Sequence, residues 1–199
     1  MLVFLKKINN RLIYLPYLKS KLNQSGRNFR FGYGGVVNCP SSFSFGNDFF
    51  CGPWAYFSSN KKTKIIIGDK VMFGPYCKII GGNHNIEWNG GAMMDAPQAF
   101  AGKGITVEDD VWCGASVLLL DGASLSEGSV IGAGSLVASY VPPYSIALGV
   151  PAKRFISRFD DGSLVTVLKA VGSKYTANEI RQLHKKHHVK PKEKIKEYE

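Results

Sequence analysis

Residues 107–142 read VEDDVW, CGASVL, LLDGAS, LSEGSV, IGAGSL and VASYVP, six consecutive blocks of six residues. The fifth position of each block is small or β-branched, and the first is always apolar: Val107, Cys113, Leu119, Leu125, Ile131 and Val137. A period of six fits neither a lone strand, which alternates every two residues, nor an α-helix with its 3.6-residue turn. It predicts a solenoid of short parallel strands, in which three hexapeptides close one triangular coil and each coil pairs with the next.

The same period occurs upstream, interrupted twice. The apolar first positions there are Phe45, Cys51, Phe57, Ile67, Phe73 and Ile79. Four extra residues fall between 57 and 67, and the step from 79 to 107 exceeds a full 18-residue coil by ten. The larger surplus lies within residues 81–104, which are rich in Gly, Asn and Met. We expect this segment to protrude as a functional loop, because loops on a rigid scaffold commonly carry function.

The composition is that of one globular domain with appendages. The chain has 199 residues, 45% of them apolar, and no apolar run approaches the roughly 20 residues of a membrane helix. Its net charge of +10 divides into +7 for residues 1–30, −3 for 31–149 and +6 for 150–199. Basic ends suit an anionic partner, namely nucleic acid, anionic lipid or a phosphorylated cofactor. We expect no nucleic-acid binding, because the body is acidic and carries no RNA or DNA motif.

Both ends of the chain predict helices. Apolar residues at helical spacing within residues 2–22 are Leu5, Ile8, Leu12 and Leu15, with basic residues between them. Pro16 is expected to break or kink this helix. Near the other end, Thr176 and Glu179 form a capping-box pattern that predicts a short helix. We therefore divide the chain into a basic helical segment (1–27), a solenoid (28–159, with the loop 81–104), and a C-terminal helix with a basic tail (160–199).

The segment 107–159 resembles the hexapeptide-repeat acyltransferases in its DDVW start, GAGS turn, VPPYSI exit and GVPAK close. The resemblance covers roughly residues 30–160 and implies an all-β fold. That fold is a left-handed parallel β-helix, here with an N-terminal helix and a short C-terminal helix. Left-handedness follows from the resemblance alone, since crossover rules favour the opposite hand. The stretch MFGPYCKIIGGNHNIEW (72–88) is most similar to sugar and polysaccharide O-acetyltransferases of surface-glycan pathways.

The resemblance implies transfer of acetyl from acetyl-CoA to a sugar hydroxyl by direct attack, without an acyl-enzyme or a metal. His84, which matches the family's catalytic histidine, is implied as the general base, because imidazole can accept a proton near neutral pH. The alternative is a loop histidine bonded to solvent. Asn83 is implied at the acceptor end, or it serves turn chemistry. Trp112 is implied to line the site, or it is an outward aromatic residue in a subunit contact.

The same resemblance implies an acetyl-CoA site on the later coils. Gly114 and Ala115 would place backbone N–H groups near the thioester oxygen, which gains charge in the transition state. Ala133, in the GAGS turn, would lie along the pantetheine arm. Lys153 and Arg154, which follow GVPA, would hold the 3′-phosphate; the alternative is a solvated basic pair.

The partners implied are a sugar or glycan acceptor and two further copies of the chain, in a homotrimer with sites between neighbouring subunits. The four cysteines show no CxxC pair and the N-terminus shows no export signal, so we expect free thiols and a cytoplasmic location. The basic N-terminal helix either caps the open end of the solenoid or makes peripheral contact with the inner membrane surface. The histidines of HKKHH (184–188) are expected at a solvated helix end. N-acetylation of an amino sugar and a non-catalytic scaffold remain alternatives.

Overall fold

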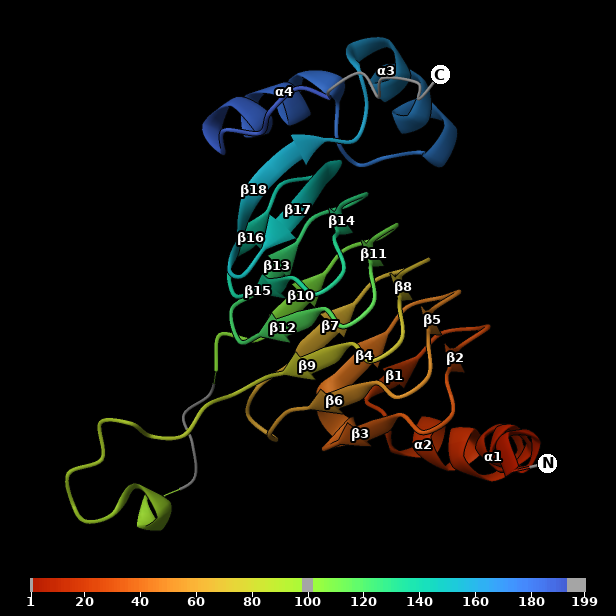
Figure 1. The fold of residues 1–199 in the computed structure, drawn as a ribbon, viewed down its shortest axis with the longest axis vertical. Helices are drawn as coiled ribbons and strands as arrows, with labels where there is room; N and C mark the ends of the chain where they lie inside the picture. The colour runs from red at the N-terminus through yellow and green to blue at the C-terminus, as the bar shows by residue number, and fades with distance from the viewer. Residues whose placement is uncertain (1, 98–101, 193–199) are drawn as a thin grey trace.

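The computed structural model describes residues 2–97 and 102–192. Within them, short strands form three sheets around one apolar interior (Figure 1). The first sheet contains β1 (Gln24–Ser25), β4 (Phe43–Phe45), β7 (Ile65–Ile67), β10 (Ile105–Val107), β13 (Ser124–Leu125) and β16 (Tyr140–Val141). The second contains β2 (Arg30–Phe31), β5 (Phe50–Cys51), β8 (Met72–Phe73), β11 (Trp112–Cys113), β14 (Val130–Ile131), β17 (Ser145–Gly149) and β18 (Ala152–Ser157). The third contains β3 (Val36–Asn38), β6 (Tyr56–Ser58), β9 (Lys78–Ile80), β12 (Leu118–Leu120) and β15 (Leu136–Val137).

The strands pair in parallel from coil to coil, and the register follows the hexapeptide pattern. Cys113, for example, lies between Phe73 of the preceding coil and Ile131 of the next. Every first-position residue quoted from residues 45–137 is 2% exposed or less. The predicted β-solenoid is confirmed, with about six coils whose interior is one continuous apolar stack.

Glycine at the coil corners is required by the close approach of neighbouring coils. A Cβ atom on Gly74 would lie 2.7 Å from the backbone nitrogen of Ala115, and one on Gly114 would lie 2.8 Å from that of Ala133. Contacts this short do not occur between real Cβ and backbone atoms. The large share of glycine in the solenoid therefore reflects, at these corners, the stacking of one coil on another.

The insertions all leave the solenoid at one corner, between the third and first sheets. They are residues 39–42 with the 3₁₀ turn η2 (Pro40–Ser42), residues 59–64, and the predicted loop 81–104 with the 3₁₀ turn η3 (Met93–Asp95). The described part of the loop extends well away from the coils (Figure 1). The irregular steps in the sequence period thus mark one edge of the solenoid, where all three insertions lie.

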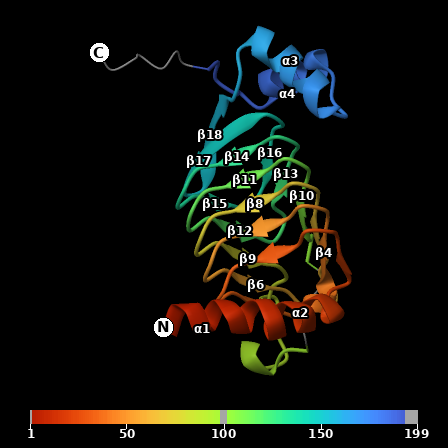
Figure 2. The ribbon, with the colours of Figure 1, turned by 90° about the vertical axis from the view of Figure 1, so that its right-hand side faces the viewer.

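The N-terminal helix lies across the open end of the first coil (Figure 2). It consists of α1 (Leu2–Asn9), the π-helical segment η1 (Asn10–Tyr14) and α2 (Leu15–Lys21). Pro16 does not break it: the helix continues past this residue, which stands in the first turn of α2 directly after the π-helical segment. No described helix combines the length and apolarity needed to cross a bilayer.

The opposite end carries the antiparallel hairpin of β17 and β18 and two helices, α3 (Asp161–Val171) and α4 (Ala177–Lys186). The capping box of Thr176 and Glu179 is confirmed, whereas α3 was not predicted. A second apolar cluster attaches these helices to the last coils: Tyr144, Leu164, Leu168 and Ile180. Within it, the Tyr144 hydroxyl donates a hydrogen bond of 2.7 Å to the buried carboxylate of Glu127.

Candidate active site

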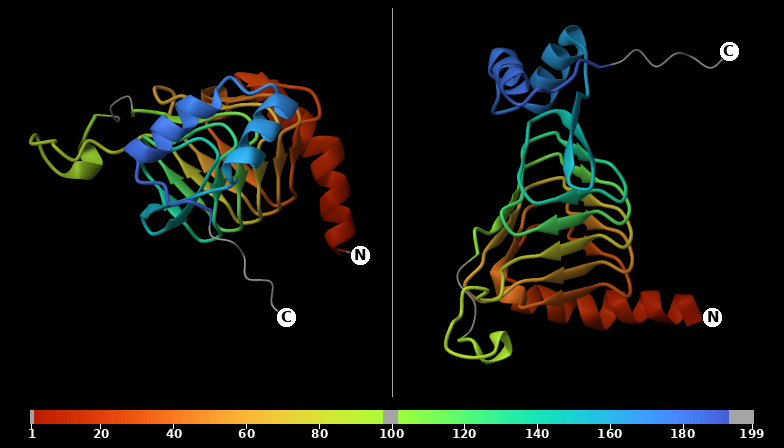
Figure 3. Two further views of the ribbon diagram at one scale, coloured as in Figure 1. Left: turned by 90° about the horizontal axis from the view of Figure 1, so that it is seen from above. Right: turned by 60° about the vertical axis from the view of Figure 1, so that its left-hand side comes forward.

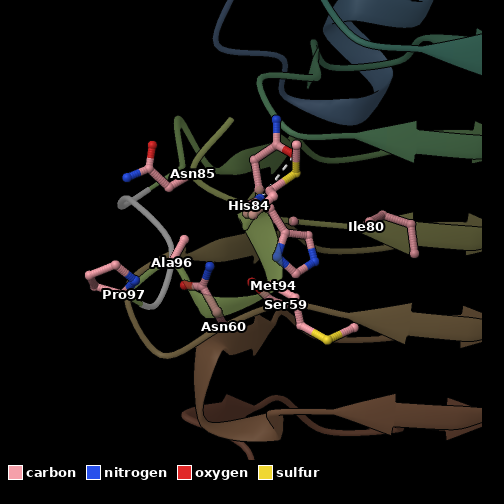
Figure 4. A pocket seen from close by; sticks show the side chains of 12 residues that line it. Ser59, Asn60, Ile80, His84, Asn85, Met94, Ala96 and Pro97 are labelled. Carbon is pink, nitrogen blue, oxygen red and sulfur yellow. Dashed lines mark hydrogen bonds between the residues drawn. The ribbon is translucent and has the colours of Figure 1, made fainter. Parts of the chain in front are cut away.

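The loop that follows β9 encloses a cavity of about 440 Å³ beside His84. One wall is Ser59 and Asn60, from the insertion of the preceding coil, and the other comes from the far limb of the loop around Met94. Figure 4 shows the His84 side chain directed into this cavity, whose lining also includes Asn85. The predicted base therefore stands at the mouth of a pocket large enough for a small acceptor group.

Asp121 fastens the base of this loop. Its carboxylate accepts hydrogen bonds from Gly82 N at 3.3 Å and Gly104 N at 3.0 Å, and also from Lys103 N at 2.9 Å. One side chain on the next coil thus holds the strand that enters the loop and the strand that leaves it. Sequence reasoning missed Asp121, because an acid before glycine in LLDGAS resembles an ordinary corner residue.

The two asparagines around His84 organise the backbone of the loop. The Asn83 side-chain oxygen accepts a hydrogen bond from His84 N, and that of Asn85 accepts one from Glu87 N, both at 3.2 Å. The turn chemistry considered for Asn83 is therefore present. Among the hydrogen bonds of the described residues, none involves the exposed imidazole of His84, which leaves its ring nitrogens open to an acceptor molecule.

The buried thiols are unsuited to nucleophilic catalysis. All four cysteines are free. Burial raises the pKa of Cys77 to about 11 and raises the pKa values of Cys51 and Cys113 well above the usual range. A protonated, buried thiol is a poor nucleophile. Direct attack by the acceptor is consistent with this arrangement.

Three of the residues expected to bind acetyl-CoA lie at a different corner, between the second and third sheets. Gly114 and Ala115 join β11 to β12, and Ala133 occupies the equivalent turn of the next coil. Gly114 is a weaker candidate than expected, because its N–H group already donates to Ile131 O at 2.8 Å. No such bond from Ala115 N occurs among the described residues, so Ala115 is the better candidate donor to a thioester oxygen.

One chain does not bring the two halves of the candidate site together. His84 follows the third-sheet strand β9, whereas Ala115 and Ala133 precede the third-sheet strands β12 and β15. The width of that sheet, about 10 Å for three residues, separates the two corners. Lys153 and Arg154 are exposed on β18, near the far end of the solenoid.

Trp112 lies on the outer face of the second sheet, where it is 50% exposed. In register with it are Met72, which is 46% exposed, and Val130. These residues form an apolar stripe across successive coils. Trp112 therefore points outward, as the alternative interpretation expected. It lies on the second sheet, whereas β9, the strand that leads to His84, belongs to the third.

The C-terminal histidines differ from the expected solvated helix end. His184 is half-buried, and its Nε2 atom lies 2.7 Å from the carbonyl oxygen of Pro143. His187 packs against the ring of Tyr140 at a centroid distance of 4.8 Å. His188 is exposed. His184 and His187 are covered by residues of the last coils, which lie more than 40 positions earlier in the chain. A local sequence pattern could not predict these contacts.

Solved structures share the fold. A maltose O-acetyltransferase from Clostridium difficile superimposes with a TM-score of 0.63 at 27% identity, covering 73% of this chain and 74% of that chain. A hexapeptide-repeat acetyltransferase from Vibrio cholerae, solved with acetyl coenzyme A, gives 0.64 at 24% identity, covering 73% and 76%. No family model matches the chain.

Sequence identity to named proteins shows the family to which the chain belongs. A galactoside O-acetyltransferase of Lactococcus lactis is 32% identical over 171 residues, covering 80% of this chain and 78% of that protein. The chain belongs to the hexapeptide-repeat acetyltransferases. A putative acetyltransferase of Schizosaccharomyces pombe is 38% identical over 92 residues, which cover 45% of this chain and 41% of that protein. The match to the yeast relative is therefore confined to less than half of either protein.

Proposed function

We propose that this protein transfers an acetyl group from acetyl-CoA to a hydroxyl group of a sugar. The observation that carries the proposal is the open imidazole of His84, directed into a cavity on a loop whose base is fixed by Asp121. The sugar acceptors named for the relatives from Lactococcus and Clostridium support this choice of acceptor class. A role in capsule, O-antigen or exopolysaccharide synthesis in the cytoplasm is part of the proposal.

In the proposed reaction, His84 removes the proton from the acceptor hydroxyl as its oxygen attacks the thioester carbon. The carbonyl oxygen gains negative charge and accepts a hydrogen bond from Ala115 N–H. The carbon–sulfur bond then breaks, and the proton held by His84 passes to the departing thiolate. The products are an acetyl ester and free coenzyme A, so the atoms and charges balance without an acyl-enzyme.

The separation of His84 from Ala115 and Ala133 supports a homotrimer. A neighbouring copy would bring its own donor-binding corner to the loop, so each site would lie between two chains. Lys153 and Arg154 would then face the 3′-phosphate of acetyl-CoA, where arginine can form paired hydrogen bonds with phosphate oxygens.

The test compares acetyl transfer by the unaltered protein and by His84→Ala, with a panel of sugars and amino sugars as acceptors. Release of the coenzyme A thiol measures the rate. Loss of a general base should lower turnover roughly 100- to 10,000-fold while the melting temperature stays unchanged. His188→Asn, which alters an exposed histidine at the far end of the molecule, is the control.

Turnover by His84→Ala close to that of the unaltered protein would remove His84 from the mechanism. The product also distinguishes the acceptor atom. Mild base hydrolyses an acetyl ester and leaves an acetamide intact, so a base-stable product would mean N-acetylation of an amino sugar.

A further inference from the structure

The N-terminal helix presents an apolar face away from the solenoid. The side that packs on the first coil contains Asn10, whose side chain donates to Phe31 O at 2.8 Å, and Leu18, which is 2% exposed. Apolar side chains that are 39% to 68% exposed lie along the rest of the helix: Leu5, Ile8, Leu12, Ile13 and Tyr17. Because a π-helical turn holds one residue more than an α-helical turn, η1 keeps Leu12 and Ile13 on the face begun by Leu5 and Ile8.

The charge around this face has one sign. The helix carries Lys6, Lys7, Arg11, Lys19 and Lys21, and residues 1–47 contain no acid. Lys6 and Lys7 lie over the rings of Trp54 and Tyr33 of the first coils, so Arg11, Lys19 and Lys21 are the cations left for an anionic partner. A helix with an apolar face and cationic flanks is the kind that lies in the interface of an anionic bilayer.

A groove between this helix and the first coils also combines apolar and cationic side chains. Its volume is about 700 Å³. Apolar side chains and three cations line it, with no acid among them: Leu15, Phe31, Phe50, Arg11, Lys19 and Arg30. The apolar floor suits an acyl chain, and the cations suit a phosphate headgroup.

The catalytic loop lies at the same end of the molecule as the helix. Figures 1 and 2 show the described part of the loop reaching the level of α1, and the right-hand view of Figure 3 places the two on either side of one end of the solenoid. The loop carries further exposed apolar residues, including Ile86 at 70% and Met94 at 94%. Helix and loop can therefore meet one flat surface together.

We propose that this end of the molecule docks on an anionic phospholipid membrane. Leu12 and Ile13 enter the boundary between headgroups and acyl chains, and the flanking cations bind lipid phosphates. The groove between the helix and the first coils takes one anionic lipid molecule. Docking is independent of acetyl transfer, so loss of either property leaves the other measurable.

The experiment is co-sedimentation of the full chain with vesicles of phosphatidylcholine, with and without phosphatidylglycerol. Binding should require phosphatidylglycerol and weaken as salt is added. Leu12→Asp/Ile13→Asp should abolish it, and Lys19→Glu should lower the partition coefficient roughly fivefold or more, the effect of one cation near an anionic surface. The matched controls on α3, Val165→Asp/Val171→Asp and Lys169→Glu, should bind as the unaltered protein does.

Three results would overturn the proposal. The first is equal vesicle binding by the unaltered protein and Leu12→Asp/Ile13→Asp, with both folded by circular dichroism. The second is loss of binding only in the α3 variants. The third is no vesicle binding together with a smaller particle mass for Leu12→Asp/Ile13→Asp, which would mean that a second copy of the chain covers this face.

Discussion

At the scale of single residues, His184 shows how contact with the last coils changes a side chain. The imidazole is half-buried against Pro143. Burial lowers the pKa of His184, and the hydrogen bond to Pro143 O offsets only part of this effect. The unfolded chain therefore takes up a proton at a higher pH than the folded chain does. The stability that neutral His184 contributes is present above about pH 6.5 and is lost as pH falls below that value.

We accordingly expect the melting temperature to fall as the pH is lowered from 7 to 5, and to fall less in His184→Gln. Burial also lowers the pKa of His187, so part of the dependence should persist in that variant. His188→Asn serves as the comparison, because His188 is exposed. An identical pH dependence for the unaltered protein and His184→Gln would contradict this account.

How far single residues could be predicted depends on how locally their environment is set. Cys51 and Cys113 occupy the interior position of a hexapeptide, and their burial could be predicted from that position alone. The half-burial of His184 depends on Pro143, 41 residues earlier, so no local sequence pattern predicts this burial. Gly114 shows a third case, because its N–H group is committed to Ile131 O by the stacking of coils.

At the scale of elements, the loop 81–104 could be predicted as an insertion, but its attachment could not. A surplus of residues shows that a loop exists. The hydrogen bonds from Gly82, Lys103 and Gly104 to Asp121 depend on the next coil and appear only in three dimensions. The N-terminal helix illustrates the same limit. Its helical period was evident, but η1 turns Leu15 toward the first coil and leaves Leu12 exposed.

Asp121→Ala should disconnect the loop from the solenoid. Three backbone N–H groups lose their acceptor, which costs about 1–3 kcal/mol of local stability for each group that water cannot reach. We expect faster hydrogen exchange at Gly82 and Gly104. We also expect kcat to fall at least about tenfold, with little change in KM for acetyl-CoA, because misplacement of a general base acts on the chemical step.

The control for this prediction is Asp69→Ala. Asp69 also accepts hydrogen bonds across coils, from Asn47 N and Asn47 Nδ2, but at a corner without a loop. Asp69→Ala should leave kcat and the exchange of the loop amides unchanged. Equal losses of kcat in the two variants would indicate that Asp121 only stabilises the solenoid.

At the scale of the whole molecule, the repeated parts of the fold could be predicted from the sequence more fully than the parts that occur once. Each coil repeats one pattern, so the solenoid itself follows from the period. The twelve first positions between Phe45 and Val137 account for four coils, and the structure adds the coil of β1 to β3 before them and the strands β16 and β17 after them. The ends of the solenoid occur once each, and both need covers for unpaired strand edges. The N-terminal helix covers one end, and the hairpin with α3 and α4 covers the other (Figure 1). The hairpin and α3 carry no repeat that could have predicted them.

The proposed sharing of each site between two copies can be tested by mixing inactive variants. His84→Ala lacks the base, and Lys153→Glu/Arg154→Glu weakens donor binding at limiting acetyl-CoA. In randomly mixed trimers, about a quarter of the sites combine an intact His84 with an intact Lys153–Arg154 pair from the neighbour. Co-expression in equal amounts should therefore restore about a quarter of full activity. Mixing two different His84 variants, Ala and Gln, is the control and should restore none. If base and donor site belong to one chain, the first mixture should also remain inactive.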